Sequence, residues 1–290
     1  MNVIELLALA AIWGASFLFM RVAAPELGPV PLIALRVTIA AIVLAPVLRS
    51  ATARSQFRSK AWPLIVVGVT NSAVPFCLLA YSTLYVNAGV DSILNATTPL
   101  WAALIAVAGF GGSMRLGQAV GLMLGLGGVV ILAWGTLIGG ASALPLAIGA
   151  ALLATLFYGF AVNYSKRHLA GVNPFVVAFG SQLFASILLI PLALFFWPKH
   201  AVAPSTWACV AALGVVCTGF AYVLFFRLVE RVSAAYAASV TFLIPIFGMV
   251  WGAVFLGEAI TSVMIAGCAI VLFGTALASG KLGWMLARSA

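Results

Sequence analysis

Residues 95–111, NATTPLWAALIAVAGFG, decide the fold, because their outline returns as residues 241–257, TFLIPIFGMVWGAVFLG. Pro99 and Gly111 of the first stretch match Pro245 and Gly257 of the second, a separation of 146 residues. Other pairs at a separation of 145 or 146 are Trp13-Gly14 with Tyr158-Gly159, Pro29 with Pro174, Gly68 with Gly214, and Gly121 with Gly267. A duplication of apolar segments with prolines at matching depths is typical of membrane proteins built from two repeats around a central site. We expect the first repeat at residues 1–140 and the second at residues 141–290.

The composition places the chain in lipid. Only 7% of its residues are charged and 65% are apolar, whereas an ordinary soluble domain carries roughly 25% charged residues. The first apolar run lacks a basic leader and matches a mid-chain segment, so we expect a retained span and not a signal peptide. A bilayer core needs roughly 20 helical residues, and the apolar stretches are too long and continuous for barrel strands. The prediction is an all-α protein with ten transmembrane helices at 3–22, 30–49, 62–82, 88–110, 116–136, 143–166, 174–196, 206–227, 233–256 and 260–280.

The basic residues give the orientation. With the N-terminus in the cytoplasm, the inner segments hold Arg49, Arg54, Arg58, Lys60, Arg115, Lys166, Arg167, Arg227, Arg231, Lys281 and Arg288. The outer segments keep only Arg21 and Lys199. This asymmetry follows the positive-inside rule and puts both termini in the cytoplasm. Because each repeat has an odd number of spans, the second enters the membrane in the opposite sense, and the repeats are inverted around a central cavity.

The same distribution bears on partners. The net charge of +9 is spread over short inner loops, so it reflects topology and anionic lipid headgroups, and we expect no nucleic-acid partner. Gly117, Gly121 and Gly125 share one face of the fifth span and allow close helix approach. Packing within a monomer is the first reading of this stripe, and a homodimer contact is the alternative.

Several motifs resemble a known family. They are Trp13-Gly14-Ala15-Ser16-Phe17 in the first span, Arg36 in the second, the helices of Pro99 and Pro245, and the ending Leu256-Gly257-Glu258. Over nearly the whole chain they resemble the EamA family of the drug/metabolite transporter superfamily, and among its members the bacterial amino-acid exporters of the YddG type. The resemblance implies a cavity lined by spans one to four and six to nine. One departure is Gly111-Gly112, where the family carries a second Gly-Glu pair, so we expect no carboxylate role there.

Polar side chains within the spans indicate the cavity, because such groups are costly in lipid and face the bundle interior. Asp91, Asn95 and Thr98 share one face of the fourth span, and Trp101 follows the break at Pro99, where a backbone carbonyl is left free. The predicted cavity residues are Trp13, Asn71, Tyr81, Asp91, Asn95, Thr98, Trp101, Tyr158, Ser181, Gln182, Tyr222 and Ser239. Ser16, Thr218 and Thr241 are further candidates. Taken singly, each can instead form an interhelical hydrogen bond.

Arg36 is the one well-embedded cation, and three roles are open to it. It can pair with Asp91, which lies at a similar predicted depth, since either charge alone in the membrane is costly. It can also extend to the outer interface, or it can contact substrate directly. Asp91 is the best candidate for proton coupling, whereas Glu258 is expected to cap or solvate an outer loop. Facilitated transport and antiport both stay open.

Enzymatic chemistry lacks a sequence signal. The chain has no Walker-type loop, no His-Glu-x-x-His helix and no Gly-x-Ser-x-Gly elbow. Cys77, Cys209, Cys217 and Cys268 lie in apolar spans, and His168 and His200 lie in loops on opposite sides, so we expect no metal and no cofactor. The interpretation is a secondary transporter of a bacterial inner membrane that exports aromatic and other neutral amino acids by alternating access. The alternatives are efflux of drugs, purines or other metabolites and, as a weaker case, an intramembrane enzyme.

Overall fold

A computed structural model describes residues 2–137 and 144–280. Within these ranges the chain forms helices of the length and apolar character that a membrane requires. The side that the basic loops assign to the cytoplasm is called the inner side below. The predicted repeat boundary at residues 140 and 141 and the cytoplasmic C-terminus lie outside the described residues.

The first five spans occupy the first half. They are span 1, α1 (Asn2–Leu27); span 2, α2 (Pro29–Leu44) with η1 (Ala45–Arg49); span 3, α4 (Ala61–Gly68), η2 (Val69–Ala73) and α5 (Val74–Ser82); span 4, α6 (Ala88–Asn95) and α7 (Thr98–Gly109); and span 5, α8 (Leu116–Leu137). A short helix, α3 (Ala51–Ser59), lies between spans 2 and 3. The sequence analysis expects a plain loop there, but the Ser50 hydroxyl accepts a bond from the Ala53 N–H and caps a helix start.

The second half repeats this order. It contains span 6, α9 (Leu144–His168); span 7, α10 (Pro174–Phe195); span 8, α11 (Pro204–Ala211), η3 (Ala212–Phe220) and α12 (Ala221–Arg231); span 9, α13 (Ala234–Ala238), η4 (Ser239–Phe242) and α14 (Ile244–Leu256); and span 10, α15 (Ser262–Ala278). Nine of these spans are long enough to cross a membrane, and the described part of span 10 is shorter. The prediction of ten transmembrane helices is therefore confirmed, with limits that agree within a few residues.

Both prolines of the opening motif break their spans. In span 4, α6 ends at Asn95 and α7 begins at Thr98, immediately before Pro99. In span 9, a 3-10 turn over Ser239–Phe242 precedes α14, which begins one residue before Pro245. A proline lacks the N–H of a continuing helix and clashes with the preceding turn, which explains both breaks.

Spans 3 and 8 carry a second matched irregularity. The middle of span 3 is wound as a π-helix over Val69–Ala73, and the middle of span 8 is wound the same way over Ala212–Phe220. Residue 69 plus the repeat separation of 146 falls inside the second segment. Wide turns of this kind occur frequently at functional sites, so the two segments mark corresponding places in the two repeats.

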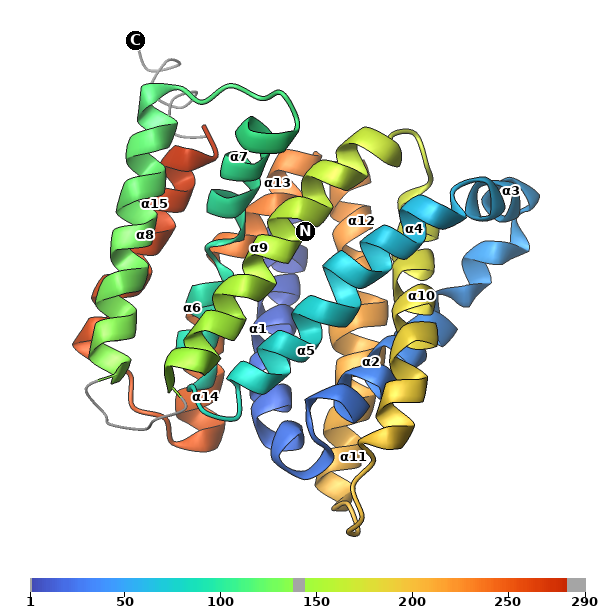
Figure 1. Ribbon diagram of the computed structural model, residues 1–290, viewed down its shortest axis with the longest axis horizontal. Helices are drawn as coiled ribbons and strands as arrows, with labels where there is room; N and C mark the ends of the chain where they lie inside the picture. Colours follow the sequence, from blue (N-terminus) through green and yellow to red (C-terminus); the bar gives the residue numbers. More distant parts are fainter. Residues whose placement is uncertain (1, 138–143, 281–290) are drawn as a thin grey trace.

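Spans 5 and 10 pack against each other at one edge of the bundle (Figure 1). A Cβ added at Gly121 would approach the Ala278 backbone nitrogen to 2.5 Å, and one at Gly274 would approach the Gly125 Cα to 2.6 Å. Only glycine permits helices to lie this close. The glycine stripe thus packs within the monomer, although Gly117 at its end contacts nothing within 4 Å of an added Cβ.

Candidate functional site

A cluster of polar and aromatic side chains joins spans 2, 3, 6 and 8 near the two π-segments. The Arg36 side chain is only 5% exposed. Its Nε donates to the Thr218 hydroxyl at 2.9 Å, one terminal nitrogen contacts the Met20 sulfur at 3.6 Å, and its guanidinium carbon lies 4.0 Å from the centre of the Phe76 ring. The guanidinium is therefore held inside the bundle by neutral partners, and it does not extend to the outer interface.

Four of the predicted residues surround this guanidinium or its neighbours. The Tyr158 ring lies edge-on to Phe76 with 6.3 Å between the ring centres, and Phe76 in turn lies under the Arg36 guanidinium. The Asn71 amide donates to the Tyr222 hydroxyl at 3.5 Å. The Trp13 ring lies 5.5 Å from Phe225, one turn beyond Tyr222. We call Trp13, Arg36, Asn71, Phe76, Tyr158, Thr218 and Tyr222 the central cluster.

The ion pair between Arg36 and Asp91 is not formed, which corrects one of the three roles weighed for Arg36. The guanidinium instead meets Thr218, Met20 and Phe76, and none of the ion pairs among the described residues joins it to a carboxylate. Both Asp91 oxygens are buried without a hydrogen-bond partner.

Two matched hydrogen bonds tie each repeat to the π-segment of the other. Arg36 of span 2 donates to Thr218 of span 8, and Gln182 of span 7 donates to the Ser72 hydroxyl of span 3 at 2.9 Å. Ser72 and Thr218 are separated by the repeat distance of 146 residues. We call these two bonds, together with the close approaches of span 7 to Gly68 and of span 2 to Gly214, the clamps.

Glycines complete the clamps. A Cβ at Gly68 would meet the Ser181 carbonyl oxygen at 2.9 Å, and one at Gly214 would meet the Arg36 carbonyl oxygen at 3.1 Å. Ser181 follows Arg36 by 145 residues, so the same approach occurs twice in opposite senses. Gly68 and Gly214 are therefore points where one repeat touches the other.

The Trp-Gly and Tyr-Gly motifs have the same explanation. A Cβ at Gly14 would meet the Phe247 Cβ at 2.7 Å, and one at Gly159 would meet the Ala102 backbone nitrogen at 2.7 Å, with Trp101 beside it. Trp101 and Phe247 occupy equivalent positions two residues after Pro99 and Pro245. Each motif therefore allows the first span of one repeat to pack against the broken span of the other repeat.

Several predicted residues keep unused hydrogen-bonding capacity. Among the described residues, buried atoms without a partner include both Asp91 oxygens, the Asn95 Oδ1, the Trp101 Nε1 and the Gln182 Oε1. Buried polar atoms are rarely left unpaired, so each such atom calls for an explanation. Three of these residues, Asp91, Asn95 and Trp101, belong to span 4 around its break.

Other predicted residues are used locally or lie elsewhere. The hydroxyls of Thr98, Ser181 and Ser239 each donate to a carbonyl three residues earlier in their own helix. Tyr81 packs on the exposed Tyr85 ring at 5.4 Å, near the outer end of span 3. The structure therefore does not bring these four into the central cluster. The carbonyl that Pro99 cannot bond is that of Asn95, and it accepts from the Thr98 hydroxyl at 2.9 Å, while the next carbonyl, that of Ala96, accepts from Thr275 of span 10 at 3.2 Å.

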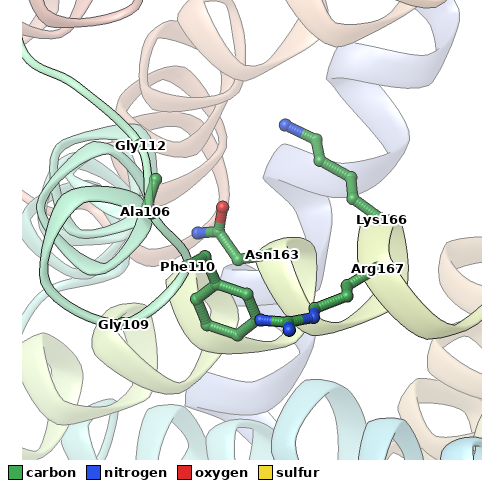
Figure 2. Close-up of a pocket in the computed structure, with 8 residues that line it drawn as sticks. Ala106, Gly109, Phe110, Gly112, Asn163, Lys166 and Arg167 are labelled. Atoms are coloured by element: carbon green, nitrogen blue, oxygen red, sulfur yellow. The ribbon is translucent and has the colours of Figure 1, made fainter.

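Sequence reasoning missed two features of the inner side. Asn163 of span 6 donates to the Ala102 and Gly159 carbonyl oxygens at 2.8 and 2.9 Å and so supports the approach at Gly159. A cavity of about 620 Å³ opens beside it, between the ends of α7 and α9. It is lined by Ala106, Gly109, Phe110, Gly111, Gly112, Asn163, Lys166 and Arg167 (Figure 2). A signal existed in the polar Asn163, which lies one turn beyond Gly159 on the same helix.

The outer side is closed by a network around Glu258. One Glu258 oxygen accepts from the Ala88 N–H at 3.2 Å, at the start of α6, and lies 3.8 Å from the Arg21 Nε. Arg21 also donates to the Thr83 carbonyl. Glu258 thus caps a helix, as expected, and additionally joins spans 1, 3, 4 and 9. We call this network the outer latch.

These features are those of a multi-pass membrane protein whose two halves repeat one pattern of spans and breaks. The match to a family model agrees with them. The EamA-like transporter family model matches residues 2–134 and 145–280, and the chain belongs to this family.

Curated relatives and a solved structure agree with this assignment. The chain is 22% identical to the uncharacterized transporter YoaV of Bacillus subtilis, over 93% of each chain. It is 26% identical to a probable terminal-alkyne amino-acid exporter of Streptantibioticus cattleyicolor, over 91% of this chain and 89% of the relative. A solved crystal structure superposes with a TM-score of 0.66 at 20% identity, covering 97% of each chain, and supports the fold.

Proposed function

We propose that the protein is a secondary transporter that exports amino acids, aromatic and other neutral ones, across a bacterial inner membrane by alternating access. The observation that carries this proposal is Arg36. It is buried, and no carboxylate among the described residues lies within ion-pair distance of it. A cation inside the membrane is costly unless an anion or hydrogen bonds compensate it, and an amino-acid carboxylate is an anion that a guanidinium binds in bidentate geometry.

The surroundings of Arg36 suit the rest of an amino acid. Tyr158, Tyr222 and Trp13 offer ring faces for an apolar or aromatic side chain. The unpartnered Asn95 and Asp91 oxygens can accept from the ammonium group. A mostly apolar pocket with a few convergent polar groups is the ordinary form of a small-molecule site. The relative named as an amino-acid exporter supports the same substrate class.

The inverted repeats supply the mechanism. The clamps and the broken spans recur in the two repeats in opposite senses. One arrangement of the repeats can therefore close the outer side, and the arrangement related to it by the two-fold axis can close the inner side. In this structure the outer halves of the broken spans pack together, since α6 contacts α14, and the outer latch joins them. The amino acid would enter from the cytoplasm and leave after the two gates exchange.

The experiment is counterflow, in which proteoliposomes loaded with an unlabelled amino acid take up the labelled amino acid from outside, over a panel of amino acids. We expect accumulation of aromatic and other neutral amino acids, and loss of at least 90% of the rate in Arg36→Gln. Arg36→Lys keeps the charge but loses the two-pronged geometry, so we expect an intermediate rate. Arg49→Gln, at an exposed inner arginine, is the control that should match the wild type.

Three outcomes would count against the proposal. If no amino acid accumulates while a dye or purine does, the protein serves the drug or metabolite efflux that the fold also supports. If Arg36→Gln is folded by size-exclusion chromatography and transports normally, Arg36 has no contact with substrate. If the Arg36→Gln protein does not fold, Asn95→Ala and Tyr222→Phe replace it, and unchanged rates in both refute the site.

A further inference from the structure

The two gates of the protein are unequal in charge. By the repeat separation, Arg21 corresponds to Lys166, and Glu258 corresponds to Gly112. On the outer side, Arg21 and Glu258 form the outer latch. On the inner side, the corresponding place holds a lysine and a glycine, and both line the cavity of about 620 Å³.

The missing carboxylate is not supplied from elsewhere. The chain has five acidic residues, and all of them lie within the described ranges. Glu5 pairs with Arg227 and Arg231, Glu26 accepts from Ala203 and Thr206, and Glu258 belongs to the outer latch. Asp91 is buried near the outer end of span 4, and Glu230 forms no ion pair with a described residue. Lys166 and Arg167 thus have no carboxylate partner among the described residues.

The cavity is built to admit a small solute. Gly111 holds a left-handed backbone conformation with φ of 72°, and the Gly112 N–H bonds back to the Ala106 oxygen at 2.9 Å, so these two glycines close the turn after α7 without placing a side chain in the cavity. In Figure 2, Arg167 extends toward Phe110, while Lys166 extends away from Arg167, and all three residues line the cavity. An aromatic ring and two cations therefore border one opening.

We infer that this inner cavity is an entry site in which the carboxylate of the incoming solute binds Lys166 and Arg167, at the place that Glu258 fills on the outer side. The inference rests on the proposed function for the identity of the solute. On the outer side the Glu258 carboxylate pairs with Arg21. On the inner side the solute carboxylate takes the equivalent place beside Lys166, so the inner gate depends on the bound solute for its anion.

The first test reads the charge of the cavity without transport. Ala106→Cys, in a variant whose four native cysteines are replaced by alanine, is labelled with an anionic or a cationic thiosulfonate reagent. We expect the anionic reagent to react faster than the cationic one. The double variant Lys166→Gln, Arg167→Gln should reduce this ratio of rates about fivefold, which corresponds to the upper range of about 1 kcal/mol for a solvent-accessible ion pair. An unchanged preference overturns the inference.

A second pair of variants rebuilds the missing latch. Gly112→Glu places a carboxylate beside Lys166 and should abolish the preference for the anionic reagent. Gly112→Gln is the matched control, since a Cβ at this position meets the Ala106 oxygen at 3.0 Å in both cases. If both variants behave alike, the effect is steric and the charge argument fails.

The third test identifies the ligand and its side of entry. Phenylalanine should slow labelling of Ala106→Cys, whereas phenylalaninamide, which lacks the carboxylate, should not. Lys166→Gln should raise the KM for phenylalanine about fivefold in inside-out vesicles and leave it unchanged in right-side-out vesicles. Protection by anionic lipid in place of the amino acid would assign the cavity to a lipid phosphate and overturn the inference. Absence of any amino-acid transport by the wild type refutes the proposed function, while the labelling preference still decides whether the cavity attracts anions.

Discussion

Glycines 149 and 159 lie on the same helix, α9, yet replacing each by alanine should have opposite effects on stability. At Gly159 the new methyl group would stand 2.7 Å from the Ala102 nitrogen and 2.9 Å from the Trp101 carbonyl carbon. Both are backbone atoms, so they cannot turn aside, and spans 4 and 6 must move apart. At Gly149 nothing lies within 4 Å of the added atom.

The magnitudes follow from these contacts. Overpacking of a close contact costs about 1–3 kcal/mol, whereas alanine in an open helix position gains about 1 kcal/mol over glycine. The free energies of unfolding of the two variants should therefore differ by about 2–4 kcal/mol. At roughly 2 °C per kcal/mol for a chain of this size, the midpoints should separate by about 4–8 °C.

The assay is thermal unfolding of the purified protein in detergent, followed by tryptophan fluorescence. Gly149→Ala should unfold at or above the wild-type temperature and transport normally. Gly159→Ala should unfold earlier and transport more slowly, because the shift displaces Trp101. Equal midpoints for the two variants would refute the close approach of spans 4 and 6.

Three further predictions rest on other contacts. In α8, Gly121→Ala should lower the unfolding midpoint, since its Cβ would meet α15 backbone at 2.5 Å, while Gly127→Ala, with open space, should not; equal midpoints would contradict this packing. Gln182→Leu should lower the free energy of unfolding by about 1–3 kcal/mol, because it leaves the Ser72 hydroxyl unpaired. A double-mutant cycle with Ser72→Ala should show a coupling energy of at least about 0.5 kcal/mol, and strictly additive losses would exclude the bond. Glu258→Gln removes the charge from the outer latch, so thiol reagents added from outside should react severalfold faster with a cysteine introduced at Asn95, in the span that the latch holds. An unchanged rate would show that the latch does not hold the gate.

Sequence reasoning reached the fold because its signals are periodic and strong. Apolar length predicts spans, basic loops predict orientation, and Pro99 and Pro245 mark both breaks. The loop lysines and arginines serve in the sequence only as markers of topology, so they do not predict the cavity beside Lys166. Whether a charged side chain is exposed to bulk water or lines a cavity depends on the relative position of two helix ends, here those of α7 and α9. The spacing of residues along the sequence does not specify that position.

The candidate site was predicted in part. Trp13, Asn71, Tyr158 and Tyr222 meet around Arg36, but helical spacing alone could not show that Arg36 turns to a threonine and a phenylalanine ring and not to Asp91. Hydroxyl residues misled for a physical reason, since a serine or threonine in a helix can donate to its own preceding turn. The finer resemblance to YddG-type exporters stays a prediction.

The duplication of the clamps has a consequence for the energetics of the transport cycle. Both clamps are closed in the same conformation, since the bonds from Gln182 to Ser72 and from Arg36 to Thr218 coexist with the close approaches at Gly68 and Gly214. Span 2 is therefore tied to span 8, and span 3 to span 7, across the two repeats. A motion that keeps these pairs together breaks no clamp, so the energy difference between the two end states is left to the gates, where the described residues form a latch on the outer side.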